Sequence, residues 1–347
     1  MLDTGRLIRE NRSTTFMIFF LILLYIFLFF AGHFSAKNHE PLSEKKENAL
    51  LKSELKQREE KARQNMMAKP RLMTALSLVF LAVLIAGIAL DAYLLLRGFH
   101  DRPWAAIMSE RPAVRWGFKE VASGFVFMFF IEGIIFISQT FWYWVMGLEK
   151  VQRDIFLLSN SIVRDLCVAA FVWMLVRSCG QSWRALGFKR ERFLQNLKTG
   201  LLGYLAIIPP MLLGFFILAA LMNFFSYEPL PQNVVQIYLK KNTTPYLFIF
   251  TLFVAVFGPV LEELFFRGFT YPALKKQMGT GKAMILTSLV FAAFHMNAAA
   301  FVPIFFLGLF LTYLYESTGS LVPSISAHVL HNALMVMMTL GFRAISA

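Results

Sequence analysis

The chain has 347 residues, of which 57% are hydrophobic and only 16% charged, and it contains 38 Phe and 17 Met. Because a soluble domain carries about a quarter charged residues, this composition excludes most soluble classes and indicates a protein embedded in the lipid bilayer. The net charge of +13 does not indicate a nucleic-acid partner. Its basic residues lie mostly in short loops between apolar runs, where membrane proteins place them.

Apolar runs along the whole chain predict an all-α fold, a polytopic transmembrane helical bundle of about eight to nine helices. A bilayer core of about 30 Å is crossed by roughly 20 apolar residues in a helix. The seventh and eighth runs are short and nearly contiguous, which predicts a tight hairpin. The candidate spans are 14–32, 72–96, 121–146, 155–177, 198–222, 245–266, 283–298, 300–315 and 321–341.

The N-terminal 70 residues combine the first span with a charged segment. The span follows three arginines, and Phe34-Ser35-Ala36 is a poor cleavage site, so an uncleaved signal anchor is favoured over a cleaved signal peptide. Residues 37–69 are dense in Lys, Arg and Glu and predict a solvated, salt-bridged helix. We interpret this segment as a spacer or short coiled coil, with an arm that docks a partner protein as the alternative.

Loop charges predict a cytoplasmic N-terminus, since the basic loops 97–119, 184–198 and 275–282 then all lie inside. The basic segment 37–69 contradicts this count, because it would fall outside. The signal anchor and the basic loops together favour a bacterial inner (plasma) membrane.

Four ionisable residues precede the C-terminal motifs within apolar runs. Asp91 lies near a span end and is expected at the interface, whereas Glu132 lies deep in the third span and is expected to be protonated or paired with Arg164. Arg164 and Asp165 in the fourth span are expected to satisfy neighbours across helices. A direct substrate or catalytic role is the alternative for each.

Helix breakers mark three spans. Pro209-Pro210 predicts an interruption of the fifth span, Gly258-Pro259 one of the sixth, and Pro323 begins the ninth. A proline inside a membrane helix frees a backbone carbonyl, which must find a partner in the protein or in trapped water.

The sequence GPVLEELFFRG, residues 258–268, places three charges in the sixth span. Glu263 and Arg267 are four residues apart and predict an ion pair on one helix face. Glu262 points about 100° away from Glu263. A purely structural alternative is that one glutamate pairs with the arginine while the other reaches water.

Polar side chains also occur in the seventh and ninth spans. His295 follows Phe291 at the end of the seventh, and His328, His331 and Asn332 lie on the ninth. His328 and Asn332 share a face because they are four residues apart. The alternatives are a hydrogen-bonded packing histidine for the first and interhelical hydrogen bonding for the others.

Taken together, these residues match the chemistry of peptide hydrolysis. That reaction needs a base to activate water, a proton donor for the leaving amine, and donors for the oxyanion. A glutamate beside a histidine can hold and deprotonate a water, and a second histidine with a carboxamide can donate to the oxyanion.

The three motifs, in this order, resemble those of the CPBP family of intramembrane proteases. This family is also called Abi, or CAAX protease and bacteriocin-processing, and includes the Rce1-like CAAX prenyl endopeptidases. Its EExxxR, FxxxH and HxxxN patterns correspond to the three segments that begin at Glu262, Phe291 and His328. The resemblance covers about 245–340.

The resemblance implies a role for each motif residue. Glu262 and His295 would bind and activate water, and His328 and Asn332 would form the oxyanion hole. Arg267 would pair with and orient the glutamates, with Glu263 in support. His331 lies outside the pattern, and its role stays open between a proton relay and packing.

A metal cofactor is not favoured. Zinc sites commonly use two histidines and a carboxylate, which Glu262, His295 and His328 could supply, but no HExxH helix is present. We expect a metal-free glutamate mechanism, with a zinc endopeptidase as the alternative.

These features predict three regions: 1–70, a signal anchor and charged segment; 71–178, accessory transmembrane helices; and 179–347, an Rce1-like protease domain. The expected substrate is a membrane-associated protein or peptide, and the resemblance leaves open whether it is lipid-modified (CAAX-type). One alternative is a non-catalytic immunity or scaffold protein of the same family. The other is a secondary transporter, which the lack of an internal repeat disfavours.

Overall fold

The computed structural model describes residues 42–101, 114–146, 150–227, 229, 231–239 and 245–347. Within these residues the chain is helical and has no strand. The predicted first span, 14–32, lies outside the described residues. The elements are α2 (Leu42–Met67), α3 (Pro70–Asp101), α5 (Phe118–Met146), α6 (Lys150–Ser178), the 3-10 turn η1 (Trp183–Leu186), α7 (Phe193–Phe224), α8 (Asn233–Leu239), α9 (Pro245–Leu252), the π-helical η2 (Phe253–Phe257), α10 (Gly258–Glu263), the π-helical η3 (Leu264–Thr270), α11 (Tyr271–Met278), α12 (Thr280–Phe294), α13 (Ala298–Thr318) and α14 (Leu321–Ile345).

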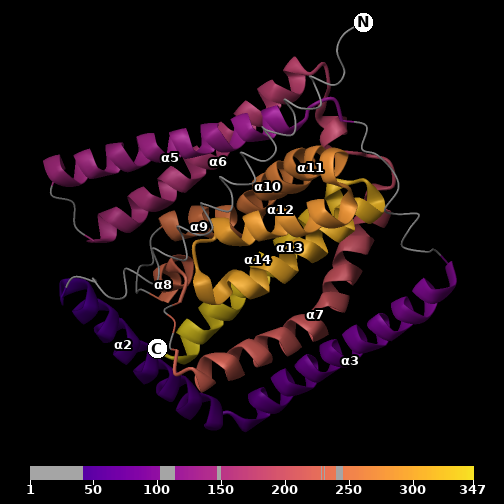
Figure 1. The fold of residues 1–347 in the computed structure, drawn as a ribbon. Coiled ribbons are helices and arrows are strands. Elements are labelled where there is room, and N and C mark those ends of the chain that lie inside the picture. Colours follow the sequence, from indigo (N-terminus) through magenta and orange to yellow (C-terminus); the bar gives the residue numbers. More distant parts are fainter. Residues whose placement is uncertain (1–41, 102–113, 147–149, 228, 230, 240–244) are drawn as a thin grey trace, which may run out of the picture.

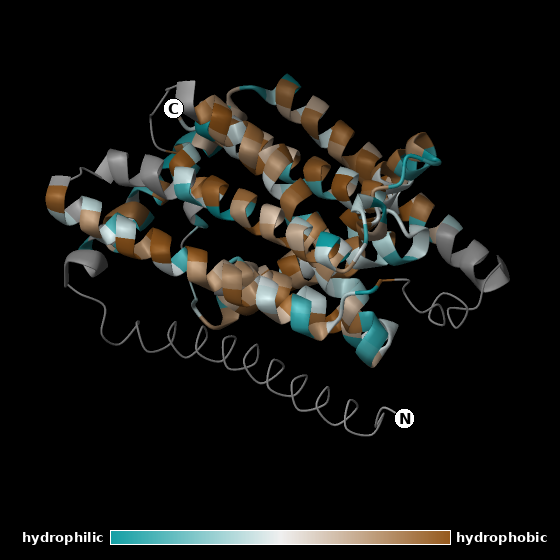
Figure 2. Ribbon diagram, turned by 90° about the horizontal axis from the view of Figure 1, so that it is seen from above, coloured by the Kyte–Doolittle hydropathy of each residue, from teal (hydrophilic) through white to brown (hydrophobic). Residues whose placement is uncertain are grey.

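The described helices form the predicted transmembrane bundle. By length and composition, seven of them can cross a membrane, and the apolar α12, with 15 residues, is a shorter one. Large apolar side chains are exposed along the bundle, where they suit contact with lipid, and apolar residues predominate along its helices in Figure 2. The predicted hairpin of the seventh and eighth spans is confirmed, because only His295–Asn297 separate α12 from α13.

The bundle is arranged around the segment from α9 to α14 (Figure 1). The α5–α6 pair packs on one side of this segment, α7 packs on α13 and α14, and α3 packs outside α7. One hydrophobic core joins α5 and α6 to η3, α11 and α12. Within it the fully buried Trp116 donates its indole N–H to the carbonyl of Phe269 at 2.9 Å. The helices that precede the motif segment therefore share its core.

The sixth span is longer than predicted. The apolar stretch that was expected to end near 266 continues to Met278 as a chain of short helical pieces. The hydropathy pattern underestimated its length because α11 carries Lys275 and Lys276. Lys275 is nevertheless paired with Glu316 of α13 at 2.5 Å, and the lysine side chain is only 9% exposed.

The predicted interruption of the fifth span at Pro209-Pro210 is wrong. Helix α7 runs through both prolines without a break. The reason lies on α3, where Gly87 has no side chain. A Cβ at Gly87 would lie 2.8 Å from both the Leu205 carbonyl oxygen and Pro209 Cγ. The backbone of α3 therefore covers the carbonyl next to the prolines, so the helix can continue in an apolar medium.

The contact between α7 and α14 depends on Gly200. A Cβ at this position would come within 2.4 Å of the Pro323 carbonyl oxygen and 2.9 Å of its Cα. We therefore expect Gly200→Ala to lower the free energy of unfolding by about 1–3 kcal/mol through overpacking, measured by thermal unfolding in detergent. Gly214→Ala on the same helix is the matched control, because nothing lies within 4 Å of its Cβ position. Equal stability of both variants would contradict the prediction.

The basic loops meet at one end of the bundle. The Arg115 N–H donates to Gln181 Oε1 at 2.6 Å, Lys276 Nζ donates to the Val114 carbonyl at 3.4 Å, and the Leu321 N–H donates to the Gly187 carbonyl at 3.0 Å. Helix α2 lies at the opposite end, against the C-terminal turns of α14, where Asn65 Nδ2 donates to the Ile345 carbonyl at 2.7 Å. The described parts of the loops used to predict orientation thus lie at one end of the bundle, and α2 lies at the other.

Candidate active site

The GPVLEELFFRG segment is an α-helical turn between two π-helical segments. The Gly258 N–H donates to the Phe253 carbonyl five residues back. The next bond in this register would join residue 259 to the Val254 carbonyl, but residue 259 is proline and has no N–H. Asn332 Nδ2 of α14 donates to the Val254 oxygen at 2.9 Å instead. The carbonyl freed by the proline has therefore found a partner, as the sequence predicted. Such π-helical distortions are frequent at functional sites.

The predicted Glu263–Arg267 ion pair is confirmed. Arg267 Nη1 lies 2.6 Å from Glu263 Oε1, and both side chains are fully buried. The other two guanidinium nitrogens face α13. Nη2 donates to the Gly308 carbonyl at 3.1 Å, and Nε donates to Thr312 Oγ1 at 3.4 Å. The guanidinium also lies over the Phe291 ring, 4.3 Å from its centroid. Arg267 is therefore held on all sides, as a buried charge requires.

His328 lies between the two glutamates. Its Nδ1 is 2.9 Å from Glu263 Oε1, and its Nε2 is 3.8 Å from Glu262 Oε2. The His328 side chain is 2% exposed and the Glu262 side chain 33% exposed. Glu262 Oε2 is buried and has no hydrogen-bond partner among the described residues. Glu263 Oε2 also lacks a partner among the described residues, but of the two glutamates it is Glu262 that reaches the surface.

His295 joins this cluster through an aromatic ring. Its Nδ1 lies 2.8 Å from the Phe291 carbonyl oxygen. Because a carbonyl oxygen can only accept a hydrogen bond, Nδ1 carries the ring proton. In the neutral ring, Nε2 is then able to accept a hydrogen bond. The Phe291 ring contacts both imidazoles edge-on, with centroid distances of 4.8 Å to His295 and 5.8 Å to His328. The phenylalanine of the FxxxH motif therefore sets the relative position of the two histidines and of Arg267.

His331 points to a different neighbour from the other histidines. Its Nδ1 lies 3.1 Å from the Tyr204 hydroxyl of α7. His331 and His328 therefore serve different contacts, although they are three residues apart on α14. Tyr204 and Thr312 are the partners that sequence reasoning missed. The sequence did contain a signal for Thr312, because it is a polar residue within an apolar span. It contained no such signal for Tyr204.

The arrangement differs in two respects from the roles that the resemblance implies. Among the hydrogen bonds and ion pairs of the described residues, His328 rather than His295 contacts Glu262, and Arg267 bonds to Glu263 rather than to both glutamates. Asn332 uses one amide N–H on Val254, which leaves the second N–H available.

A second ionic cluster lies on the α5–α6 pair. Arg164 Nε donates to Asp165 at 2.9 Å, and Arg164 Nη1 lies 3.3 Å from Glu132, so the expected pairing of Glu132 with Arg164 is confirmed. Helix α6 packs against α10 and η3, which places this cluster beside the motif residues. The Glu132 side chain is 54% exposed in the middle of a span, which is typical of a residue that faces a hydrated cavity.

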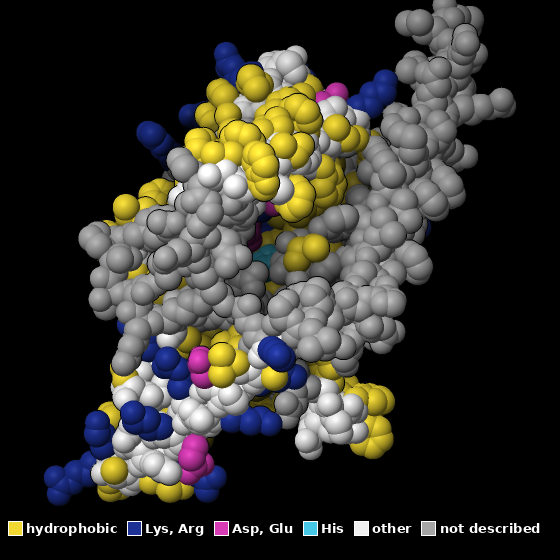
Figure 3. All heavy atoms as spheres, turned by 90° about the vertical axis from the view of Figure 1, so that its left-hand side faces the viewer, with side chains coloured by type: hydrophobic (Ala, Val, Ile, Leu, Met, Phe, Trp, Pro, Cys, Tyr) yellow, Lys and Arg dark blue, Asp and Glu magenta, His cyan; other side chains and the backbone are white. Residues whose placement is uncertain are grey.

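The molecule is hollowed beside these residues. Figure 3 shows a recess in the face on the left of Figure 1, and an acidic and a histidine side chain are visible inside it. The partial exposure of Glu262 agrees with such an opening.

A zinc ion, the alternative to the metal-free mechanism, would need Glu262, His295 and His328 as ligands. In the part of the chain that the structure describes, no three His, Cys, Asp or Glu side chains are arranged to hold a metal ion. Glu263 Oε1 is bonded to both Arg267 and His328, and His295 Nδ1 is bonded to its own helix.

The fold and the cluster define a polytopic helical membrane protein with a buried polar site built from three motif segments. Residues 244–334 match the family of type II CAAX prenyl endopeptidase Rce1-like proteins. This match lies in the C-terminal half of the chain and agrees with the resemblance that its motifs predict. Comparisons with curated proteins and with solved structures give no match.

Proposed function

We propose that the chain is an intramembrane endopeptidase that hydrolyses a peptide bond in a membrane-associated, CAAX-type protein. The observation that carries this proposal is the position of Glu262 Oε2, which lacks a hydrogen-bond partner among the described residues and faces His328 Nε2 across 3.8 Å. Glu263 Oε2 also lacks a partner there, but its side chain is fully buried, whereas the Glu262 side chain is 33% exposed. A buried carboxylate oxygen without a partner is costly. A water molecule or a substrate group supplies the missing bond and is thereby placed where a carboxylate can deprotonate it.

In the proposed reaction, Glu262 and His295 hold the attacking water. Its oxygen bonds to the carbonyl carbon of the substrate as Glu262 takes its proton. His295 Nε2, left as an acceptor by the Nδ1 bond to Phe291, orients the same water. The proton then moves to the leaving nitrogen, the C–N bond breaks, and the products are a carboxylic acid and an amine.

The oxyanion is proposed to bind His328 and Asn332. With Nδ1 directed at the Glu263–Arg267 ion pair, a protonated His328 presents its Nε2–H to the developing negative charge. The second amide N–H of Asn332 lies one helical turn away on the same face. Glu263 and Arg267 are positioning residues in this proposal, because Glu263 contacts His328 and Arg267 holds Glu263, and neither is assigned a contact with the reacting atoms. Preorganised donors of this kind stabilise a tetrahedral intermediate.

The experiment that tests the function compares peptides from membranes of cells that express the wild-type protein or Glu262→Gln at equal levels. We expect peptide termini that are present with the wild type and absent with the variant, and these termini identify the substrate. Identical peptide sets would overturn the proposal. If deletion of 42–67 removes a cellular phenotype that Glu262→Gln retains, the non-catalytic scaffold alternative holds instead.

The glutamate mechanism predicts resistance to chelators. Because Glu262, His295 and His328 act without a metal in this proposal, we expect cleavage by the purified protein to be unchanged after prolonged treatment with EDTA and with 1,10-phenanthroline. Loss of activity that added zinc restores would show a zinc endopeptidase instead.

We further propose that the basic end of the bundle faces the cytoplasm of a bacterial cell and that the N-terminus is cytoplasmic. The convergence of the basic loops at one end supports this orientation. A cysteine introduced at Arg190, in one of these loops, should be labelled by an impermeant maleimide only after the inner membrane is opened. Labelling in intact spheroplasts would reverse the orientation.

A further inference from the structure

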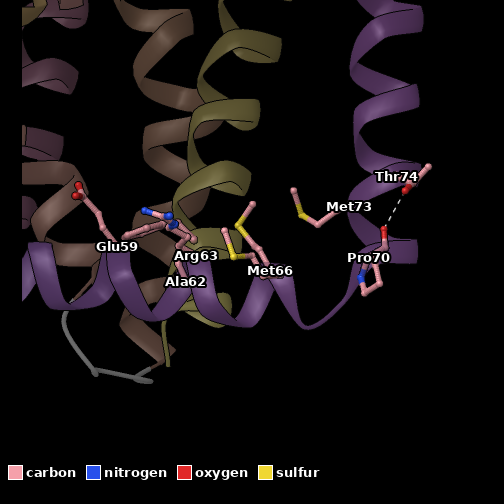
Figure 4. Close-up of a pocket in the computed structure, with 9 residues that line it drawn as sticks. Glu59, Ala62, Arg63, Met66, Pro70, Met73 and Thr74 are labelled. Carbon is pink, nitrogen blue, oxygen red and sulfur yellow. Dashed lines mark hydrogen bonds between the residues drawn. The ribbon is translucent and has the colours of Figure 1, made fainter.

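A pocket of about 620 Å³ lies at the elbow between α2 and α3, beside the last turns of α14 (Figure 4). Its walls are apolar and flexible. Three methionines contribute to it, together with a small residue of α2 and an aromatic residue of α14. These wall residues are Ala62, Met66, Met67, Met73 and Phe342. Unbranched methionine side chains adapt to irregular apolar occupants.

The pocket lies at the boundary between polar and apolar chain. Helix α2 is rich in charged residues and ends at Met67, whereas an apolar membrane span begins at Pro70 on α3. In Figure 1, α2 turns away from α3 and lies across the end of the bundle. The pocket therefore opens at the depth where lipid headgroups meet acyl chains.

The elbow that forms the pocket is rich in basic residues. Arg63 lines the pocket, and Lys69 and Arg71 follow within the elbow. All three are exposed, and within the described ranges none of them forms an ion pair. Glu59 is the single acidic residue of the lining, and it forms no ion pair with Arg63. Counted over the lining and the elbow, three basic residues thus stand against one acidic residue, and this excess complements an anionic headgroup.

We propose that this pocket binds one anionic phospholipid, with an acyl chain among the methionines and the phosphate on Arg63, Lys69 and Arg71. Through Phe342, the bound lipid would connect the α2–α3 elbow to α14. The hydrogen bond from Asn65 to the Ile345 carbonyl already joins α2 to the same end of α14. Helix α14 also carries His328 and Asn332. This inference does not depend on the proposed hydrolysis.

The first test measures lipid affinity by native mass spectrometry of the full chain, with phosphatidylglycerol as the probe and phosphatidylcholine as the neutral comparison. We expect tighter binding of phosphatidylglycerol and a roughly fivefold weaker affinity in Arg63→Ala, the effect of one basic residue near an anionic surface. Arg58→Ala is the matched control, because it removes the same charge from α2 but does not line the pocket. Equal affinities for both lipids, or equal losses in both variants, would overturn the proposal.

The second test identifies the occupant. A photoreactive benzoylphenylalanine at Met73 should cross-link to phosphatidylglycerol in nanodiscs, and Met66→Trp should reduce this adduct by filling the pocket. Adducts with residues 1–41 of the same chain, or with a second copy of the chain, would show that protein occupies the pocket and would overturn the proposal. The absence of any lipid adduct in the folded protein would have the same meaning.

Discussion

Glu262→Gln is expected to reduce peptide hydrolysis by about 10²–10⁴-fold, the usual contribution of a positioned general base, without lowering thermal stability. Glutamine keeps the size of the side chain but cannot take a proton from water. Stability should be retained because Glu262 Oε2 makes no hydrogen bond within the described structure and the side chain is one-third exposed. The measurement is the cleavage rate of a quenched fluorescent membrane peptide, together with the unfolding temperature of the same preparation.

The matched control is Glu132→Gln, which makes the same chemical change in another membrane-embedded carboxylate. Glu132 accepts one long bond from Arg164 at 3.3 Å and is more exposed than Glu262. We expect its variant to keep activity within about threefold, since a partly exposed ion pair contributes little. If the two variants lose activity equally, the base is not Glu262 alone, and the cluster on α6 belongs to the reaction.

His328→Gln and His331→Gln extend the comparison to α14. His328 contacts Glu263 and faces Glu262, whereas His331 bonds to Tyr204. We expect a loss of about 10²–10³-fold, typical of a missing oxyanion donor, for the first variant and a small change for the second. A comparable loss in His331→Gln would favour its alternative role as a proton relay.

Much of the site could be predicted from the sequence because its strongest contact is local. Residues four apart on a helix are neighbours, and a charge in a membrane span needs a partner. The Glu263–Arg267 pair follows from these two rules. Contacts between helices do not follow in this way. That His328 rather than His295 faces Glu262 depends on the rotation of α12 and α14 about their axes, which the Phe291 ring determines through its contacts with both imidazoles.

The wrong prediction at Pro209-Pro210 has a similar origin. The rule that proline interrupts a helix considers only one chain segment. Here a glycine on α3, more than 100 residues earlier, brings a second backbone against the Leu205 carbonyl. In the sixth span, likewise, the carbonyl freed by Pro259 is that of Val254, and it accepts a hydrogen bond from Asn332 on another helix. There the sequence predicted that a partner must exist, but it could not identify the partner.

Arg267→Met is expected to destabilise the protein by about 3–5 kcal/mol, the cost of leaving one member of a buried ion pair without its partner. Glu263 is fully buried, and its Oε1 accepts from both Arg267 and His328. Without the guanidinium, the carboxylate loses its charged partner and keeps the His328 imidazole as a donor. Methionine also loses the bonds to the Gly308 carbonyl and to Thr312. The unfolding midpoint in detergent measures the loss.

The double variant Arg267→Met/Glu263→Gln separates two causes of this loss of stability. One is the unpaired charge of Glu263, and the other is the loss of the arginine's contacts with α13 and Phe291. Glutamine can still accept from His328 but carries no charge, so most of the stability should return if the unpaired charge is the main cost. Arg164→Met is the control for a lost arginine, and its partly exposed pair predicts a change of about 0–1 kcal/mol. If the double variant is no more stable than Arg267→Met, the guanidinium acts mainly through α13 and Phe291. The role of Arg267 would then be to pack the hairpin that carries His295, rather than to hold the carboxylate beside His328.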